Sequence, residues 1–145
     1  RRNARLEAEL QAIEGAVEAV RAVHARLGGR IACASGADRF KVEMQLEMVG
    51  LAPYFAGRIF SGHEMPRTKP APDVYLAAAA ALGVPPARCL VVEDTVTCVA
   101  AGVAAGATVV GYSPSPVGHG SPEALRAAGA VHVMADMGEL LALLG

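Results

Sequence analysis

The sequence predicts an α/β fold, a doubly wound and mostly parallel sheet with helices on both faces. Short apolar runs alternate along the chain with longer segments of helical composition, and this alternation is typical of parallel sheets. Two runs, CLVVE at 89–93 and TVVGY at 108–112, are as apolar as strands buried on both faces. The length of 145 residues suits one domain.

The first helix and strand follow from hydrophobic periodicity. Residues 15–28 have helical spacing of their apolar side chains. The stripe consists of Val17, Val20, Val23 and Leu27. A short apolar run, RIACAS at 30–35, follows and predicts a strand.

Residues 38–49 are ambiguous, because their apolar and polar residues alternate as in a half-buried strand. We interpret them as a helix, since Met, Gln, Leu and Glu favour helix. Asp38 can cap the start of this helix and Gly50 can end it.

The remaining elements rest on apolar runs and capping residues. Strands are predicted at residues 58–61, 89–93, 108–112 and 131–135. Helices are predicted over residues 74–82 and 95–105, and from Ser121 and Asp136, which can serve as N-caps.

Composition excludes several function classes. The formal net charge is −1 and the 13 Lys and Arg residues are scattered, which argues against a nucleic-acid partner. The longest uncharged stretch is broken by Pro114 and Pro116, so no membrane span is expected. Three widely spaced cysteines favour neither a disulfide framework nor a zinc site, and we expect a reducing cytoplasm.

Ligands of doubly wound sheets bind beyond the carboxyl ends of the strands, which directs attention to the strand ends. Ser35 and Gly36 follow one strand, where a hydroxyl and backbone N–H groups can cradle a phosphate or simply form a tight turn. Lys69 precedes Pro70 in an extended segment, where its ammonium suits an anion or is solvated in a loop.

The adjacent acids Glu93 and Asp94 end another strand. Two unit charges at ~4 Å repel by about 4 kcal/mol at an effective dielectric constant of 20, so the pair calls for a cation. Carboxylate oxygens favour a hard ion such as Mg²⁺. The alternative, that Asp94 or Thr95 caps the next helix, explains one acid but not both.

Four further segments are informative together, namely GLAPYF, RTKPAPDVYLAAA, LVVEDT and AAGVAAG, at residues 50–55, 67–79, 90–95 and 100–106. In this order and spacing they resemble the haloacid dehalogenase superfamily, in its phosphatase branch with a helical cap. The resemblance implies a Rossmann-like three-layer core. It also implies Mg²⁺-dependent hydrolysis of a small phosphorylated metabolite, of the sugar phosphate or phosphoglycolate type, through an aspartyl-phosphate.

The resemblance assigns a role to each strand-end residue. Ser35 would hydrogen-bond the transferring phosphoryl group, with help from the Gly36 N–H. Lys69 would stabilise charge on the phosphoryl oxygens and the nucleophile. Glu93 and Asp94 would hold Mg²⁺.

This sequence departs from the family pattern at two places. Cys98 stands where the family usually has Gly, and the Asp-x-Asp motif that supplies the nucleophile does not occur in the 145 residues. By the resemblance, residues 1–13 are the end of the cap domain with its hinge. Residues 14–145 are the core without its first strand, which would lie between the strands that end at Ser35 and Asp94. We therefore expect these residues alone to be inactive.

Three alternatives remain open. A phosphosugar mutase of the β-phosphoglucomutase type would pass the phosphoryl group to a sugar instead of water. A phospho-accepting receiver domain, or a binding module without a nucleophile, would use the same residue types without hydrolysis. A dehalogenase would leave the Glu93–Asp94 pair unexplained.

His63, His119 and Arg67 could contact a ligand, whereas Tyr75 is expected to be a packing residue.

Overall fold

The computed structural model describes residues 16–35, 38–114 and 121–143. The predictions for residues 1–13, Gly36 and His119 lie outside these ranges. The helices are α2 (Ala16–Arg26), α3 (Arg39–Met48), α4 (Asp73–Leu82), α5 (Val96–Ala104), α6 (Pro122–Ala128) and α7 (Leu140–Leu143). The strands are β1 (Cys33–Ser35), β2 (Ile59–Ser61), β3 (Leu90–Glu93), β4 (Thr108–Tyr112) and β5 (His132–Met134).

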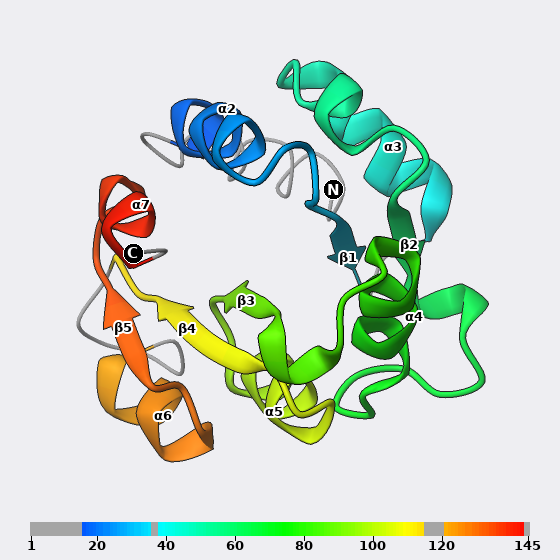
Figure 1. Ribbon diagram of the computed structural model, residues 1–145. Coiled ribbons are helices and arrows are strands. Elements are labelled where there is room, and N and C mark those ends of the chain that lie inside the picture. Colours follow the sequence, from blue (N-terminus) through cyan, green and yellow to red (C-terminus); the bar gives the residue numbers. More distant parts are fainter. Residues whose placement is uncertain (1–15, 36–37, 115–120, 144–145) are drawn as a thin grey trace.

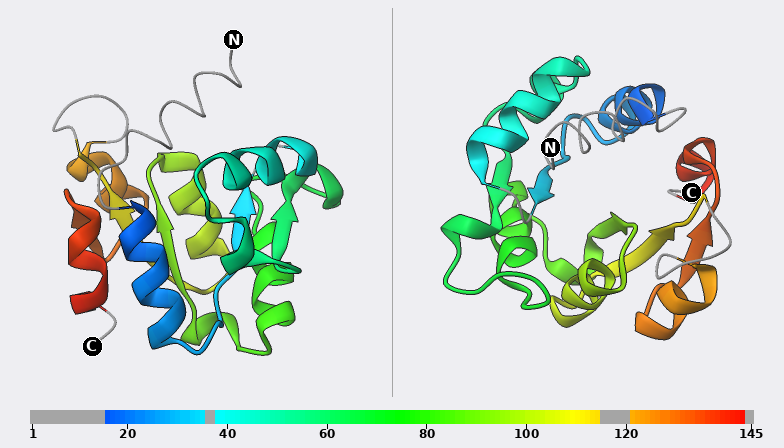
Figure 2. Two further views of the ribbon diagram at one scale, coloured as in Figure 1. Left: turned by 90° about the horizontal axis from the view of Figure 1, so that it is seen from above. Right: turned by 180° about the vertical axis from the view of Figure 1, so that it is seen from behind.

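The elements form three layers, which confirms the predicted α/β class (Figure 1). Helices α2, α3 and α7 lie on one side of the strands, and α4, α5 and α6 lie on the other. Figure 2 shows α2 beside α7, although they are far apart in sequence. No helix among the described residues is long and apolar enough to cross a membrane.

The strands form two parallel sheets with the orders β1-β2 and β3-β4-β5. Within residues 16–35, 38–114 and 121–143, no strand pairs with the second edge of β1 or of β3. The interruption lies between the strand that ends at Ser35 and the strand that precedes Asp94. The prediction that residues 89–93 are buried on both faces is wrong, because β3 is half-buried along its length. Among the described residues β3 pairs only with β4, so no described strand covers its other edge.

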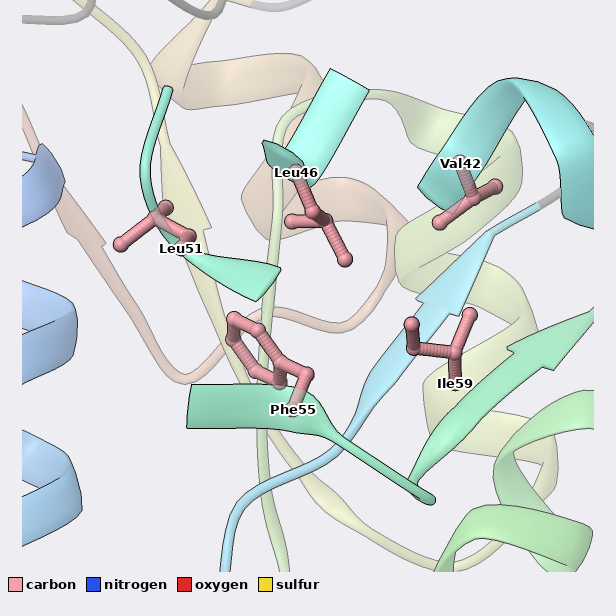
Figure 3. Packing of buried hydrophobic residues seen from close by; sticks show 5 residues of the cluster. All are labelled: Val42, Leu46, Leu51, Phe55 and Ile59. Carbon is pink, nitrogen blue, oxygen red and sulfur yellow. The ribbon is translucent and has the colours of Figure 1, made fainter. Parts of the chain in front are cut away.

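Alternate residues of each strand supply the two faces of the core. On the α2–α3 face, Ile59 packs with residues of α3 and of the 3₁₀ turn η1 (Ala52–Phe55). The buried cluster on that face comprises Val42, Leu46, Leu51, Phe55 and Ile59 (Figure 3). On the opposite face, Val74 and Tyr75 of α4 pack with Ala101 of α5. Because this second cluster also contacts Ala34 and Val91, it joins the two sheets.

The ambiguous segment 38–49 is a helix, as predicted. The Asp38 carboxylate accepts a hydrogen bond of 3.0 Å from the Lys41 N–H and caps α3. Val42 and Leu46, one turn apart, are buried on the same face. The first strand is shorter than predicted, since pairing with β2 begins only at Cys33.

Candidate active site

Lys69 occupies the junction between the two sheets. It lies in the loop that leads from β2 to α4, and its side chain is only 8% exposed. Its ammonium donates a hydrogen bond of 2.9 Å to Glu93 Oε2, at the end of β3. It also donates to the Ala34 carbonyl oxygen, at 3.4 Å, in β1. One side chain therefore connects the carboxyl-end regions of strands that do not pair with each other.

The Lys69–Glu93 ion pair is buried, because the Glu93 side chain is only 14% exposed. Removing charges from water is costly, and a buried pair is tolerable only when further hydrogen bonds satisfy both partners. The Tyr75 hydroxyl supplies one of these by donating to Glu93 Oε2. The Tyr75 ring also lies 4.8 Å from the Lys69 ammonium, within the range of a cation–π interaction.

Tyr75 does more than the packing role that its sequence position indicates. It is buried, as predicted, but its hydroxyl reaches the ion pair. Burial, and then the neighbouring Glu93 carboxylate, raises the pKa of the Tyr75 hydroxyl above its ordinary value. A neutral hydroxyl can donate a hydrogen bond, and it does so to the Glu93 carboxylate.

Cys98 is a second residue whose contact sequence reasoning missed. Its sulfur lies 3.7 Å from the Lys69 ammonium. The Thr95 hydroxyl caps α5 by accepting a hydrogen bond of 3.3 Å from the Cys98 N–H, which places Cys98 in the first turn of that helix. Burial, followed by the effect of Glu93, raises the pKa of the Cys98 thiol. The sequence signal that pointed to Cys98 is that it stands, four residues after Asp94, where the family usually has Gly.

Ser35 and Asp94 lie at the same strand-end region as the ion pair. Ser35 ends β1, directly after the Ala34 carbonyl that accepts from Lys69, and it is in register with Ser61 of β2. Asp94 follows Glu93 and is exposed. The predicted residues Ser35, Lys69, Glu93 and Asp94 therefore gather around the junction of the sheets.

The two acids differ in their surroundings. One oxygen of Glu93 already accepts from Lys69 and Tyr75, whereas Asp94 is exposed at the strand end. Mg²⁺ in phosphoryl-transfer sites is held by one or two carboxylates together with waters and substrate phosphate. Asp94, with or without Glu93, fits that requirement. The described part of the chain contains no group of three or more His, Cys, Asp or Glu residues suited to a metal.

The other candidate ligand contacts lie apart from the Lys69 contacts. Arg67 forms an ion pair of 2.8 Å with Asp73 at the start of α4. His63 is exposed in a short 3₁₀ turn after β2, where its N–H donates to the Ser61 hydroxyl.

Comparisons with known proteins show which family the chain is similar to. A family model described as haloacid dehalogenase-like hydrolase matches residues 1–106. The chain is 32% identical over 116 residues to the 6-phosphogluconate phosphatase of Escherichia coli, a match that covers 80% of this chain and 50% of that protein.

Solved structures of this family superpose well on the chain. One is a hydrolase from Deinococcus radiodurans with bound phosphate and sodium, at a TM-score of 0.80 and 38% identity, covering 91% of this chain and 58% of that one. Another is a putative β-phosphoglucomutase from Thermotoga maritima, at a TM-score of 0.76 and 28% identity, covering 90% and 58%. The chain thus spans between half and three fifths of the length of these relatives.

Proposed function

The chain belongs to the haloacid dehalogenase-like hydrolases, and on that premise we propose that it forms the phosphoryl-transfer core of a Mg²⁺-dependent phosphatase. The proposed substrate is a small phosphorylated metabolite such as a sugar phosphate. The observation that carries the proposal is the buried Lys69–Glu93 pair at the junction of the two sheets, with Ser35 and Asp94 beside it.

The residues of the chain have separate tasks in this reaction. The Ser35 hydroxyl donates a hydrogen bond to a phosphoryl oxygen and orients the group. The Lys69 ammonium stabilises the negative charge that spreads over the phosphoryl oxygens in the transition state. Glu93 and Tyr75 are positioning residues. The Glu93 carboxylate holds the Lys69 ammonium, and the Tyr75 hydroxyl holds that carboxylate. Preorganised charge of this kind needs no reorganisation when the reaction occurs.

Asp94, assisted by Glu93, is the proposed holder of Mg²⁺. When bound, the ion supplies positive charge that neutralises the phosphoryl oxygens. Asp94 is exposed and directly follows Glu93 at the end of β3.

The nucleophile is proposed to come from outside the 145 residues. The family resemblance assigns it to an aspartate in an Asp-x-Asp motif, and the sequence contains no such motif. A parallel strand that carries this motif would pair with the facing edges of β1 and β3. Its aspartate would then attack phosphorus, and water would hydrolyse the resulting acyl phosphate.

An assay of phosphate release tests both the role of Lys69 and the external origin of the nucleophile. We expect a longer chain that carries an Asp-x-Asp strand ahead of residue 1 to release phosphate from sugar phosphates in the presence of Mg²⁺. Lys69→Ala in that chain is expected to lower kcat by about 10²–10³, the effect of losing one oxyanion-stabilising donor. Mg²⁺-dependent turnover by the 145 residues alone would refute the assignment of an external nucleophile.

A mutase is the second candidate, favoured by the likeness to the putative β-phosphoglucomutase of Thermotoga maritima. The two functions share the same core residues and differ in the acceptor of the phosphoryl group. Parallel assays of phosphate release and of sugar phosphate isomerisation on one substrate panel distinguish them. Isomerisation without phosphate release would replace the phosphatase proposal.

A further inference from the structure

The contacts of Lys69 place a primary amine against a thiol. An ammonium carries three N–H donors, and Lys69 has three hydrogen-bond partners on the chain, namely Glu93, Ala34 and Cys98. The Cys98 sulfur, at 3.7 Å, is a weak acceptor and a nucleophile for peroxide. The hydrolytic roles above do not use this sulfur.

We propose that Lys69 and Cys98 are a modification site, at which peroxide produces a reversible covalent cross-link between the two side chains. Peroxide first oxidises the thiol to a sulfenic acid and is itself reduced to water: RSH + H₂O₂ → RSOH + H₂O. The Lys69 amine then attacks the sulfenic sulfur, an S–N bond forms, and the hydroxyl leaves as water: RSOH + R′NH₂ → RS–NHR′ + H₂O. Condensation of a sulfenic acid with a nitrogen to give a sulfenamide is established chemistry for cysteine.

Glu93 supplies the acid–base step that this reaction needs. An ammonium is not nucleophilic, so Lys69 must lose a proton before it attacks. Glu93 Oε2, at 2.9 Å, is placed to accept that proton, and the departing hydroxyl takes a second proton from the attacking nitrogen and leaves as water. The amine, the proton acceptor and the sulfur therefore lie within one set of contacts.

The local structure keeps the two reacting atoms together. Cys98 is held in the first turn of α5 by the cap from Thr95. Lys69 is held by Glu93, Ala34 and the Tyr75 ring. Burial slows oxidation of a thiol, so excess peroxide is required.

The cross-link would also switch off the phosphatase, a consequence that rests on the proposed function. A sulfenamide nitrogen carries no ammonium charge, so Lys69 could no longer stabilise the phosphoryl oxygens. Thiol reductants cleave the S–N bond and restore both side chains. The cross-link itself is detected by mass and does not depend on any activity.

Peptide mapping of the oxidised protein tests the proposal. Cys89→Ser removes the more exposed thiol, and the purified folded variant is treated with excess peroxide and digested without reductant. Trypsin cuts after arginine and not at Lys69–Pro70, so Lys69 lies in peptide 68–88 and Cys98 in peptide 89–126. We expect these two peptides to be joined, with a mass two hydrogens below their sum, and to separate after treatment with dithiothreitol.

Two controls decide between the possible products. Lys69→Arg keeps the positive charge but removes the amine, and we expect it to gain oxygen at Cys98 without a cross-link. Treatment of the same protein in denaturant is expected to yield oxygen adducts only. A disulfide that joins peptide 31–39 to peptide 89–126, oxygen adducts alone in the folded protein, or equal cross-linking in denaturant would each overturn the proposal.

Discussion

Removing the charge of Glu93 should lower the free energy of unfolding more than removing one partner of any other ion pair described above. Glu93→Gln keeps the size and shape of the side chain but removes the charge that compensates Lys69. Both side chains are well shielded, at 8% and 14% exposed, so solvent screens the pair poorly. Loss of one partner of a buried pair costs about 3–5 kcal/mol, because the other charge remains buried.

The structure places this case at the lower end of that range. Lys69 retains the Ala34 carbonyl and the Tyr75 ring as partners after the substitution. We therefore expect the free energy of unfolding to fall by about 3 kcal/mol, a large fraction of the 5–15 kcal/mol typical of a folded domain. Urea denaturation followed by circular dichroism measures this change.

Glu43→Gln is the matched control, since it makes the same substitution in an exposed ion pair. Arg39 and Glu43 are 3.5 Å apart on α3, with side chains 40% and 48% exposed. Exposed pairs at this helical spacing contribute about 0.3–0.5 kcal/mol. A Glu93→Gln effect no larger than the Glu43→Gln effect would refute the argument that burial makes the Lys69–Glu93 pair energetically important.

The double variant Lys69→Met/Glu93→Leu distinguishes loss of charge balance from loss of packing. Replacing both members of a buried pair by apolar residues is often neutral or stabilising. We expect the double variant to be more stable than Glu93→Gln. If it is less stable, the shape of the site and not the uncompensated charge explains the loss.

Three further predictions concern the frame around the site. Gly102→Ala should destabilise the protein by about 1–3 kcal/mol, since a Cβ would lie 2.7 Å from a methyl of Val109; a raised melting temperature would contradict this. Asp38→Ala should cost about 0.5–2 kcal/mol through loss of the α3 cap, whereas Asp38→Asn keeps the acceptor and should cost less in the same urea titration. Burial raises the pKa of Cys33 from 9.0 to about 11. The unfolded chain therefore loses this proton first, and stability should fall by about 1.4 kcal/mol per pH unit as pH rises between those values. Cys33→Ala should flatten that part of the profile of unfolding free energy against pH.

Sequence reasoning was most successful for elements with local signals. The helix at 38–49 illustrates this, because the Asp38 cap outweighed a misleading alternation of apolar and polar residues. The strand at 108–112 was predicted at its observed bounds, since β4 lies between two neighbouring strands and is buried along most of its length. The same reasoning overstated the burial of β3, because an apolar composition does not reveal which neighbours a strand has.

The candidate site was predictable as a set of residues but not as a set of contacts. Strand ends and motif spacing indicated Ser35, Lys69 and the Glu93–Asp94 pair. The contact between Lys69 and Glu93 joins residues 24 positions apart and depends on how two separate sheets are placed. The Tyr75 hydroxyl and the Cys98 sulfur are directed by that same tertiary arrangement, so a local pattern cannot reveal their targets.

The position of the ion pair explains why two charges lie in a core that is mostly apolar. The second buried cluster would hold α4 and α5 together through Val74 and Ala101 without any ionic group. Stability alone therefore does not call for Lys69 and Glu93, because an apolar pair of similar volume serves as well or better. A buried ammonium that connects two strand ends, and that is held by a carboxylate, a carbonyl and a ring, is instead suited to binding an anion at a defined place. A binding measurement with orthophosphate and Mg²⁺ separates these explanations, since the apolar double variant should keep its fold and lose the affinity.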